Sequence, residues 1–336
     1  MRRLLIFSTF LFFGSQLWAQ DDLGRLLASG VDDAKTFATD YLRPGTRASV
    51  FNLSNGWYQS AEVKDVLGFE FSIIGNAGVN LNDHHSFNMN TADYQNLQFV
   101  DGSAEKDVST ILGHNPQPVD VYLEYDTPFG KQQVEVTLPD GLAAAGVEFV
   151  PAAFLQARLG IFKGTELKAR YFPKINYDNV EAEIYGAGLQ HEITSWLPLD
   201  LPVAISGLVA YTKMNGSYDF TEQSYLDGEN QRIKTNMDSW LFSGIVSTNF
   251  PVINFYGGLG YMTGSSDTAM LGTYIVNDET TGYVISEVED PFTIVDDING
   301  MKANLGVALK LGFFKITGDY SFQEYDAVSV GMHLSF

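Results

Sequence analysis

Cysteine is absent from this sequence of 336 residues, so no disulfide bond stabilises the fold. Long hydrophobic runs are scarce as well. After residue 20 no stretch of about eighteen consecutive apolar residues occurs, which excludes an ordinary membrane-spanning helix. Basic residues are few, with 20 Lys and Arg against 41 Asp and Glu and a net charge of −21. Nucleic acid is therefore excluded as a partner, because phosphate binding requires a basic surface.

The sequence also lacks the short motifs that mark common enzymes. H-E-x-x-H, G-x-S-x-G, the P-loop and G-x-G-x-x-G are all missing. Of the five histidines only His84 and His85 are adjacent. Because a zinc site needs three or four ligands, this pair alone does not predict a metal site. We therefore expect no enzymatic activity, no cofactor and no resident metal.

What is present begins with an export signal. Arg2 and Arg3 precede the apolar stretch Leu4–Phe13, and Ala19 occupies the last position before a cleavage site. A basic region, a short apolar region and a small residue are the parts of a secretory signal peptide. We expect residues 1–19 to be removed, which would lower the net charge from −21 to −23 because two arginines are lost.

The last ten residues, AVSVGMHLSF, alternate with period two. Val328, Val330, Met332, Leu334 and Phe336 are large and apolar, whereas the residues between them are small or polar. Such alternation gives a strand one apolar face. In a membrane barrel the apolar face contacts lipid and the polar face lines the lumen.

Similar segments recur from residue 67 onward, and most have the roughly 9–11 residues that a tilted strand needs to cross a bilayer. Short and long connections alternate between them, as in outer-membrane barrels. The sequence thus predicts that residues 67–336 are all-β and form a transmembrane antiparallel up-and-down β-barrel of about 12 strands, with a range of about 10–14. The predicted strands are residues 67–80, 119–126, 132–138, 151–161, 164–172, 181–194, 202–214, 237–249, 252–264, 300–311, 313–323 and 327–336.

Residues 20–66 do not follow this alternation. Val31, Phe37 and Tyr41 recur at helical spacing, and Leu42–Gly45 with its proline predicts the end of a short helix. Two interpretations remain: a helical plug inside the barrel, or a periplasmic or disordered tail. Many leucines and aromatic residues argue against disorder. The candidate plug residues are Asp32, Asp33, Phe37, Asp40, Tyr41 and Trp57.

Three stretches of the chain resemble known barrel families. The final strand ending in Phe336 resembles the terminal signal of bacterial outer-membrane barrels. That resemblance implies the outer membrane and its lipid as the location, and the barrel-assembly machinery as a partner. DDAKTFATDYLRPG, LSNGWYQSAEV and IYGAGLQHEITSWLP are similar to an uncharacterised family of Bacteroidota outer-membrane barrels, which has no assigned activity.

The order of short helix, turn, polar link and first strand in residues 20–75 resembles the N-terminal hatch of long-chain fatty-acid transporter barrels. In those barrels the hatch sits inside the lumen. This chain departs from the pattern because it has Ser54-Asn55-Gly56 in place of their Asn-Pro-Ala-Gly, and because it is shorter than they are.

Charged residues on the polar faces of the predicted strands are the candidates for lining a pore. Such charges either tune the selectivity of a pore or form salt bridges with the plug acids Asp32, Asp33 and Asp40, and the sequence does not separate the two roles. The lumen-lining candidates are Glu166, Lys168, Arg170, Lys302, Lys310, Lys315, Asp319 and His333.

Residues 265–299 contain eight acidic residues and no Lys or Arg, and we expect them to form a long extracellular loop. Calcium binds carboxylate oxygens, so Ca²⁺ is one possible ligand of this loop. The D-x-D-x-D-G spacing is missing, however, so a solvated acidic surface is the simpler interpretation.

Two functions fit these patterns. A barrel with an amphipathic plug predicts a plugged channel or transporter for a small amphipathic or hydrophobic solute. The alternative is a structural or adhesive outer-membrane protein that acts through the predicted loops 81–118, 215–236 and 265–299. A lumen that is filled completely by side chains would favour the alternative.

Overall fold

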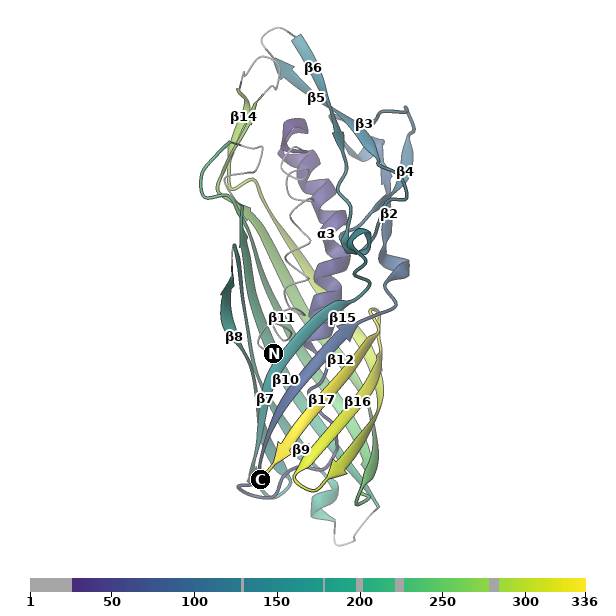
Figure 1. Cartoon of the computed structure of the whole chain (residues 1–336), viewed down its shortest axis with the longest axis vertical. Helices are drawn as coiled ribbons and strands as arrows, with labels where there is room; N and C mark the ends of the chain where they lie inside the picture. The colour runs from purple at the N-terminus through teal and green to yellow at the C-terminus, as the bar shows by residue number, and fades with distance from the viewer. Residues whose placement is uncertain (1–25, 128–129, 178, 198–201, 221–226, 278–283) are drawn as a thin grey trace.

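The computed structural model describes residues 26–127, 130–177, 179–197, 202–220, 227–277 and 284–336. These residues form a closed barrel with a folded cap at one end (Figure 1). The predicted signal peptide, residues 1–19, lies outside the described residues.

Ten antiparallel strands close the barrel, in the order β1-β17-β16-β15-β12-β11-β10-β9-β8-β7 and back to β1. They are β1 Phe69–Gly78, β7 Val150–Phe162, β8 Thr165–Tyr177, β9 Val180–Glu192, β10 Val203–Asp219, β11 Arg232–Thr248, β12 Ile253–Leu271, β15 Phe292–Leu311, β16 Phe314–Phe322 and β17 Ala327–Ser335. The main chains of Phe69 and Phe336 exchange hydrogen bonds of 3.1 and 2.8 Å beside the closing pair, β1 and β17. The predicted antiparallel barrel is confirmed, with a strand number at the lower end of the predicted range.

One end of the barrel carries tight connections, and we call it the turn end. β7–β8, β11–β12 and β15–β16 are joined there by short turns, and β9–β10 are joined there by the longer segment 193–202. At the opposite loop end, residues 79–149 form the largest connection. Two loop-end connections, residues 178–179 and 323–326, are short, so the predicted alternation of short and long connections does not hold at every loop-end joint.

The exterior of the barrel is an apolar belt. In β17 the outward residues Val330 and Met332 are 54% and 49% exposed, whereas Ser329 and His333 are buried, as the alternation predicted. Aromatic residues border this belt at both ends. Towards the loop end they are Tyr171, Tyr185, Tyr211, Trp240 and Tyr261, and at the turn end they are Phe162, Trp196, Phe250, Phe255, Phe313 and Phe336. An apolar band between two aromatic girdles is the exterior of a membrane-spanning barrel.

Two of the predicted barrel strands lie in the cap instead. Predicted strands 119–126 and 132–138 correspond to β5 Asp120–Thr127 and β6 Gly130–Thr137, which pair with each other in a separate sheet. Val121 is buried in the core of the cap. Period-two alternation with one buried face is common to a soluble sheet and a barrel wall, so the prediction was wrong for these two strands.

The remaining cap elements surround β5 and β6. They are η1 Leu26–Ser29, η2 Asn82–His84, β2 Ser86–Asn90, η3 Thr91–Asp93, β3 Leu97–Phe99, β4 Glu105–Ser109, η4 Leu142–Ala145, β13 Thr273–Asn277 and β14 Val284–Glu289, while η5 Thr194–Trp196 lies at the turn end. The prediction that residues 265–299 form one long loop was wrong. β12 and β15 continue as paired strands beyond the belt, and the β13–β14 hairpin joins them.

The helix α3, Val31–Leu53, rises from the mouth of the barrel into the cap (Figure 1). The predicted end at Leu42–Gly45 was wrong, because α3 continues through Pro44 for two further turns. Gly45 lies against Ile111, so close that an added Cβ would stand 2.6 Å from the Ile111 Cγ2 atom. Burial of the last two turns therefore outweighs the cost of the proline. Among the described residues no helix is long and apolar enough to cross a membrane.

The main apolar core lies around α3. The Phe37 ring stacks on Tyr41 with centroids 5.7 Å apart and meets the edge of Phe87 at 5.8 Å. Nearer the barrel, the Phe51 ring lies 5.8 Å from that of Tyr325. α3 is thus held by aromatic packing that closes the mouth of the barrel from above.

Candidate functional site

The chain that follows α3 runs through the lumen. We call residues 54–66 the lumen segment: it begins below α3 and reaches β1 at the turn end. The side chains of Asn55, Trp57 and Gln59 are buried. Because the segment has no regular secondary structure, its main-chain N–H and C=O groups need partners on the barrel wall.

Basic residues of the wall bind carbonyl oxygens of this stretch. Arg170 donates from Nη1 and Nη2 to the Leu53 and Asn55 carbonyls at 2.9 and 2.8 Å. Lys168 Nζ donates to the Trp57 carbonyl at 2.7 Å. From the opposite wall, Lys302 donates to the Ser54 carbonyl at 3.3 Å and to the Asn55 side chain. The hydrogen bond that each cation donates thus takes the place of one that the carbonyl oxygen would otherwise accept from water.

Acidic and polar residues of the wall bind the amide groups further along. Glu166 accepts from the Lys64 N–H at 2.9 Å, and Glu192 accepts from the Val63 N–H at 3.0 Å. Gln190 donates to the carbonyls of Ser60 and Ala61. The wall therefore matches the polarity of the segment, with donors at its carbonyls and acceptors at its amides.

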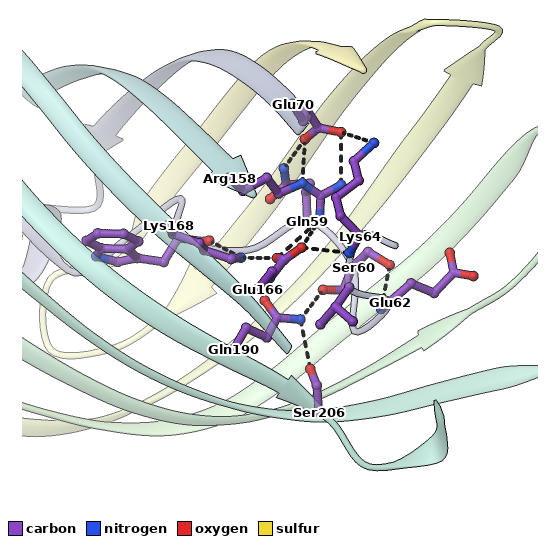
Figure 2. Close-up of polar contacts among 12 residues, drawn as sticks. Gln59, Ser60, Glu62, Lys64, Glu70, Arg158, Glu166, Lys168, Gln190 and Ser206 are labelled. Carbon is purple, nitrogen blue, oxygen red and sulfur yellow. Dashed lines mark hydrogen bonds and ion pairs between the residues drawn. The ribbon is translucent and has the colours of Figure 1, made fainter. Parts of the chain in front are cut away.

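A buried ion cluster lies at the turn-end half of the lumen (Figure 2). Arg158 binds Glu70 through two parallel hydrogen bonds of 2.9 Å each, which is the strong bidentate arrangement. Lys315 approaches the same carboxylate at 3.2 Å. Arg158 and Lys168 each lie 3.3 Å from Glu166, so the cluster continues into the residues that bind the lumen segment.

The other face of the lumen adds apolar contacts. Trp57 and Tyr58 pack in a small cluster with wall residues of β10–β12, such as Leu208. The Arg170 guanidinium lies between two rings, 4.1 Å from the centroid of Trp57 and 4.0 Å from that of Phe154. These are cation–π distances, so the face of the Arg170 guanidinium contacts the Trp57 ring of the lumen segment. This contact adds to the hydrogen bonds that its N–H groups donate.

The structure places the predicted lumen residues on the inner wall, but with different partners from those expected. Lys302, Lys315, Asp319 and His333 are buried. Asp319 accepts from the Tyr256 hydroxyl at 2.9 Å. The His333 ring contacts the hydroxyls of Ser72 and Thr317 at 2.7 and 2.8 Å. Lys310 is only half-buried and lies 3.2 Å from Glu62 at the turn end.

Of the predicted plug residues, Trp57 lies in the lumen, whereas the others belong to α3 and the cap. Asp33 accepts from the main-chain N–H groups of Gln95 and Asn96, and the Tyr41 hydroxyl donates to the Asp140 carbonyl. Phe37 is in the aromatic core.

Of the two roles left open for the wall charges, salt bridges with the helix acids are not the arrangement that the described residues show. Asp40 forms its ion pair with Arg43, one turn further along α3, and Asp32 stands exposed in the first turn of the helix. The wall bases bind the backbone of the lumen segment instead. α3 forms salt bridges to the barrel through Arg47, which lies 2.9 Å from Asp296 and 3.1 Å from Glu324. Burial lowers the pKa of the Arg47 guanidinium, but these two carboxylates raise it more, so the net pKa is above its usual range.

Sequence reasoning missed several residues that complete the site, among them Gln59, Glu70, Arg158 and Gln190. Glu70 and Arg158 face inward by the same alternation that identified Glu166, so the pattern contained this signal. Gln59 donates to Glu70 at 2.8 Å. No sequence pattern predicts such a contact, because the lumen segment has no periodicity.

Within the described ranges, no group of three or more His, Asp or Glu side chains is arranged to hold a metal ion. Two of the acids in the acidic stretch 265–299, Asp278 and Glu279, lie outside those ranges. Asp296 faces Arg47 instead.

Fold and site together define a class: a membrane-spanning antiparallel barrel whose lumen is occupied by its own N-terminal segment. The chain belongs to a family of unknown function (DUF6588), whose profile matches residues 1–336. No curated protein matches it.

Three solved barrels are similar in part. The translocator domain of the autotransporter NalP from Neisseria meningitidis has 9% identity and a TM-score of 0.31, over 96% of this chain and 99% of that one. Ail, the attachment invasion locus protein of Yersinia pestis, has 8% identity and a TM-score of 0.27, over 80% and 96%. The CymD monoaromatic hydrocarbon channel has 8% identity and a TM-score of 0.20, over 81% and 89%. At these TM-scores the three structures carry no argument about the function of this chain.

Proposed function

We propose that this protein is an outer-membrane barrel, closed by its own chain, that anchors an acidic cap at the cell surface. Export by the predicted signal peptide, residues 1–19, would bring it to that membrane. Outer-membrane barrels have short periplasmic turns and longer extracellular loops. The turn end is then periplasmic, and the cap stands outside the cell.

The observation that carries this proposal is the binding of the lumen segment by both kinds of wall residue. Cations from β8 and β15 bind its carbonyls, and carboxylates from β8 and β9 bind its amides. A solute path through the lumen would have to break these bonds and expose the Arg158–Glu70 pair. Breaking one side of a buried ion pair costs about 3–5 kcal/mol, which favours a permanently closed barrel.

The cap supplies the surface that would do the work. Residues 81–149 contain eleven acidic residues against two lysines, a net charge of −9. They fold into small sheets around α3 and form a defined surface rather than flexible loops. A surface of this charge attracts a partner with a basic face, such as a cationic protein or polymer.

Conductance in a planar bilayer tests the closed barrel. The refolded full chain should give no single-channel steps in 1 M KCl. Binding of fluorescent polylysine to vesicles that carry the protein tests the cap, and it should weaken steeply as salt is raised. Regular conductance steps from the full chain, or polylysine binding equal to that of protein-free vesicles, would contradict the corresponding half of the proposal.

A plugged channel for a small amphipathic or hydrophobic solute is the second candidate. It is favoured by the polar character of the contact between the lumen segment and the wall, because water can replace each hydrogen bond as a segment moves. The double variant Arg170→Ala/Lys302→Ala removes the two bases that hold the start of the segment. Conductance that appears in this variant, together with solute-dependent conductance of the full chain, would favour the channel over the anchor.

A further inference from the structure

A hollow lies on the outer face of the apolar belt. Gly207 of β10 and Gly244 of β11 are direct cross-strand partners and both face outward. A Cβ added at Gly207 would have no heavy atom within 4 Å, and one at Gly244 would meet only the Leu259 carbonyl, at 4.0 Å. The hollow measures about 510 Å³.

Large apolar side chains surround this glycine pair. Leu189, Val209 and Phe242 line the hollow and are 47%, 42% and 45% exposed. An outward glycine elsewhere in the described barrel can lack such a glycine partner. Gly75 of β1, for example, lies between Ala153 of β7 and Val330 of β17 in the register. The hollow thus arises because two glycines are paired side by side, flanked by large residues.

A polar group and a cation stand at the turn-end side of the hollow. His191 is the other cross-strand partner of Gly207, and its Nδ1 atom lies 2.8 Å from the Thr165 hydroxyl. No hydrogen bond within the described structure uses its Nε2 atom. The His191 ring lies 6.2 Å from that of Trp196, and Lys163 Nζ is 5.5 Å from the Trp196 ring. An apolar hollow therefore leads to an aromatic ring and an ammonium group at the edge of the belt.

We propose that this feature is a binding site for one phospholipid of the turn-end leaflet, with an acyl chain in the hollow and the phosphate beside Lys163. The proposal rests on the membrane placement described under Proposed function. Between the two girdles the surrounding medium is hydrocarbon, so an acyl chain is the occupant available there. Lys163 stands at the depth of the headgroups, where its positive charge complements a phosphate.

The test uses quenching of Trp196 fluorescence by a brominated lipid. The Trp240→Phe variant is placed in phosphatidylcholine vesicles with an increasing fraction of dibrominated phosphatidylglycerol. Trp196 is then the lipid-facing reporter in the described chain, since Trp57 is sealed in the lumen. We expect quenching to saturate at a lipid fraction several-fold lower than in a variant without the hollow.

Two variants and one matched control separate the parts of the site. Gly207→Leu fills the hollow and should abolish the early saturation. Gly75→Leu makes the same change on the outer face of β1, where an added Cβ also meets nothing within 4 Å, and should leave quenching unchanged. Lys163→Gln should retain quenching but lose about fivefold in preference for the anionic lipid, because a lysine at an anionic membrane surface contributes about that factor.

Each other outcome overturns the proposal in a distinct way. Equal quenching curves for Gly207→Leu and Gly75→Leu would mean that no specific site exists. A dimer seen by sedimentation in detergent, and lost only in Gly207→Leu, would assign the hollow to a second copy of the chain. If brominated lipid quenches Trp196 in none of the proteins, the membrane placement fails as well as the lipid site.

Discussion

α3 and the lumen segment follow one another in the chain, yet their surroundings differ in kind. In α3, Phe37 and Phe51 pack against other aromatic rings of the cap and the barrel mouth. In the lumen segment, the main chain binds charged side chains such as Lys168 and Glu166. Apolar packing loses stability in proportion to the contact removed, whereas a buried ion network fails when a single partner is lost. The barrel is thus closed in two ways, by apolar packing at its mouth and by polar contacts in its lumen. These two kinds of interaction respond differently to mutation.

The largest effect should come from Glu70→Gln, which breaks the polar half of this comparison. The substitution leaves Arg158 and Lys315 facing a neutral amide in a buried site. We expect a loss of about 3–5 kcal/mol in the free energy of unfolding, measured with urea on the refolded protein in vesicles.

Glu181→Gln is the matched control, because its partner Lys174 is exposed, and it should leave the unfolding midpoint unchanged. A loss below about 1 kcal/mol for Glu70→Gln, the size of an ordinary substitution, would mean that the cluster is hydrated rather than buried.

Phe37→Ala breaks the apolar half. It removes a ring that is fully buried against Tyr41 and Phe87, and we expect the cap to lose about 3 kcal/mol. Limited proteolysis should then cut within residues 81–149 while the planar-bilayer current stays at zero, because the lumen segment is untouched. Conductance in this variant would show that α3, and not the segment below it, closes the barrel.

Gly258→Ala sharpens the comparison inside the lumen. A Cβ at this position would stand 2.3 Å from the Tyr58 hydroxyl, which donates to Asn304 at 2.6 Å. Displacing Tyr58 should cost about 1–2 kcal/mol, the value of one buried hydrogen bond. Gly207→Ala makes the same change into open space on the outer face and should not destabilise the protein, so equal effects of the two variants would contradict the close contact.

Asp40→Asn should have the smallest effect. Asp40 and Arg43 form an i,i+3 pair of 3.2 Å on the open side of α3, and both side chains are about half exposed. A pair of this kind contributes at most about 0.5 kcal/mol. A larger loss of stability in the urea experiment would reveal that the polar face of α3 has a partner.

The sequence predicts which side of the wall each residue occupies, and it does so from alternation alone. Lys302 and Lys315 were placed in the lumen because their neighbours in the chain are large and apolar. Their partners were not predictable, because the wall binds main-chain groups that every residue carries, so no side-chain pattern marks them. Likewise, alternation at Val121 does not distinguish a cap sheet from a barrel strand. The resemblance of residues 20–75 to a transporter hatch stays a prediction.

The seam between β1 and β17 has a consequence for the order of assembly. β1 starts at the turn end, while α3, which precedes it in the chain, stands at the loop end. The closed barrel therefore encloses a segment that crosses it from the loop end to the turn end. A circularly permuted protein that begins at Phe69 and carries residues 26–66 after Phe336 would have to push a helix through a finished ring. In the natural order the lumen segment leads directly into β1, so it can be enclosed when β17 pairs with β1.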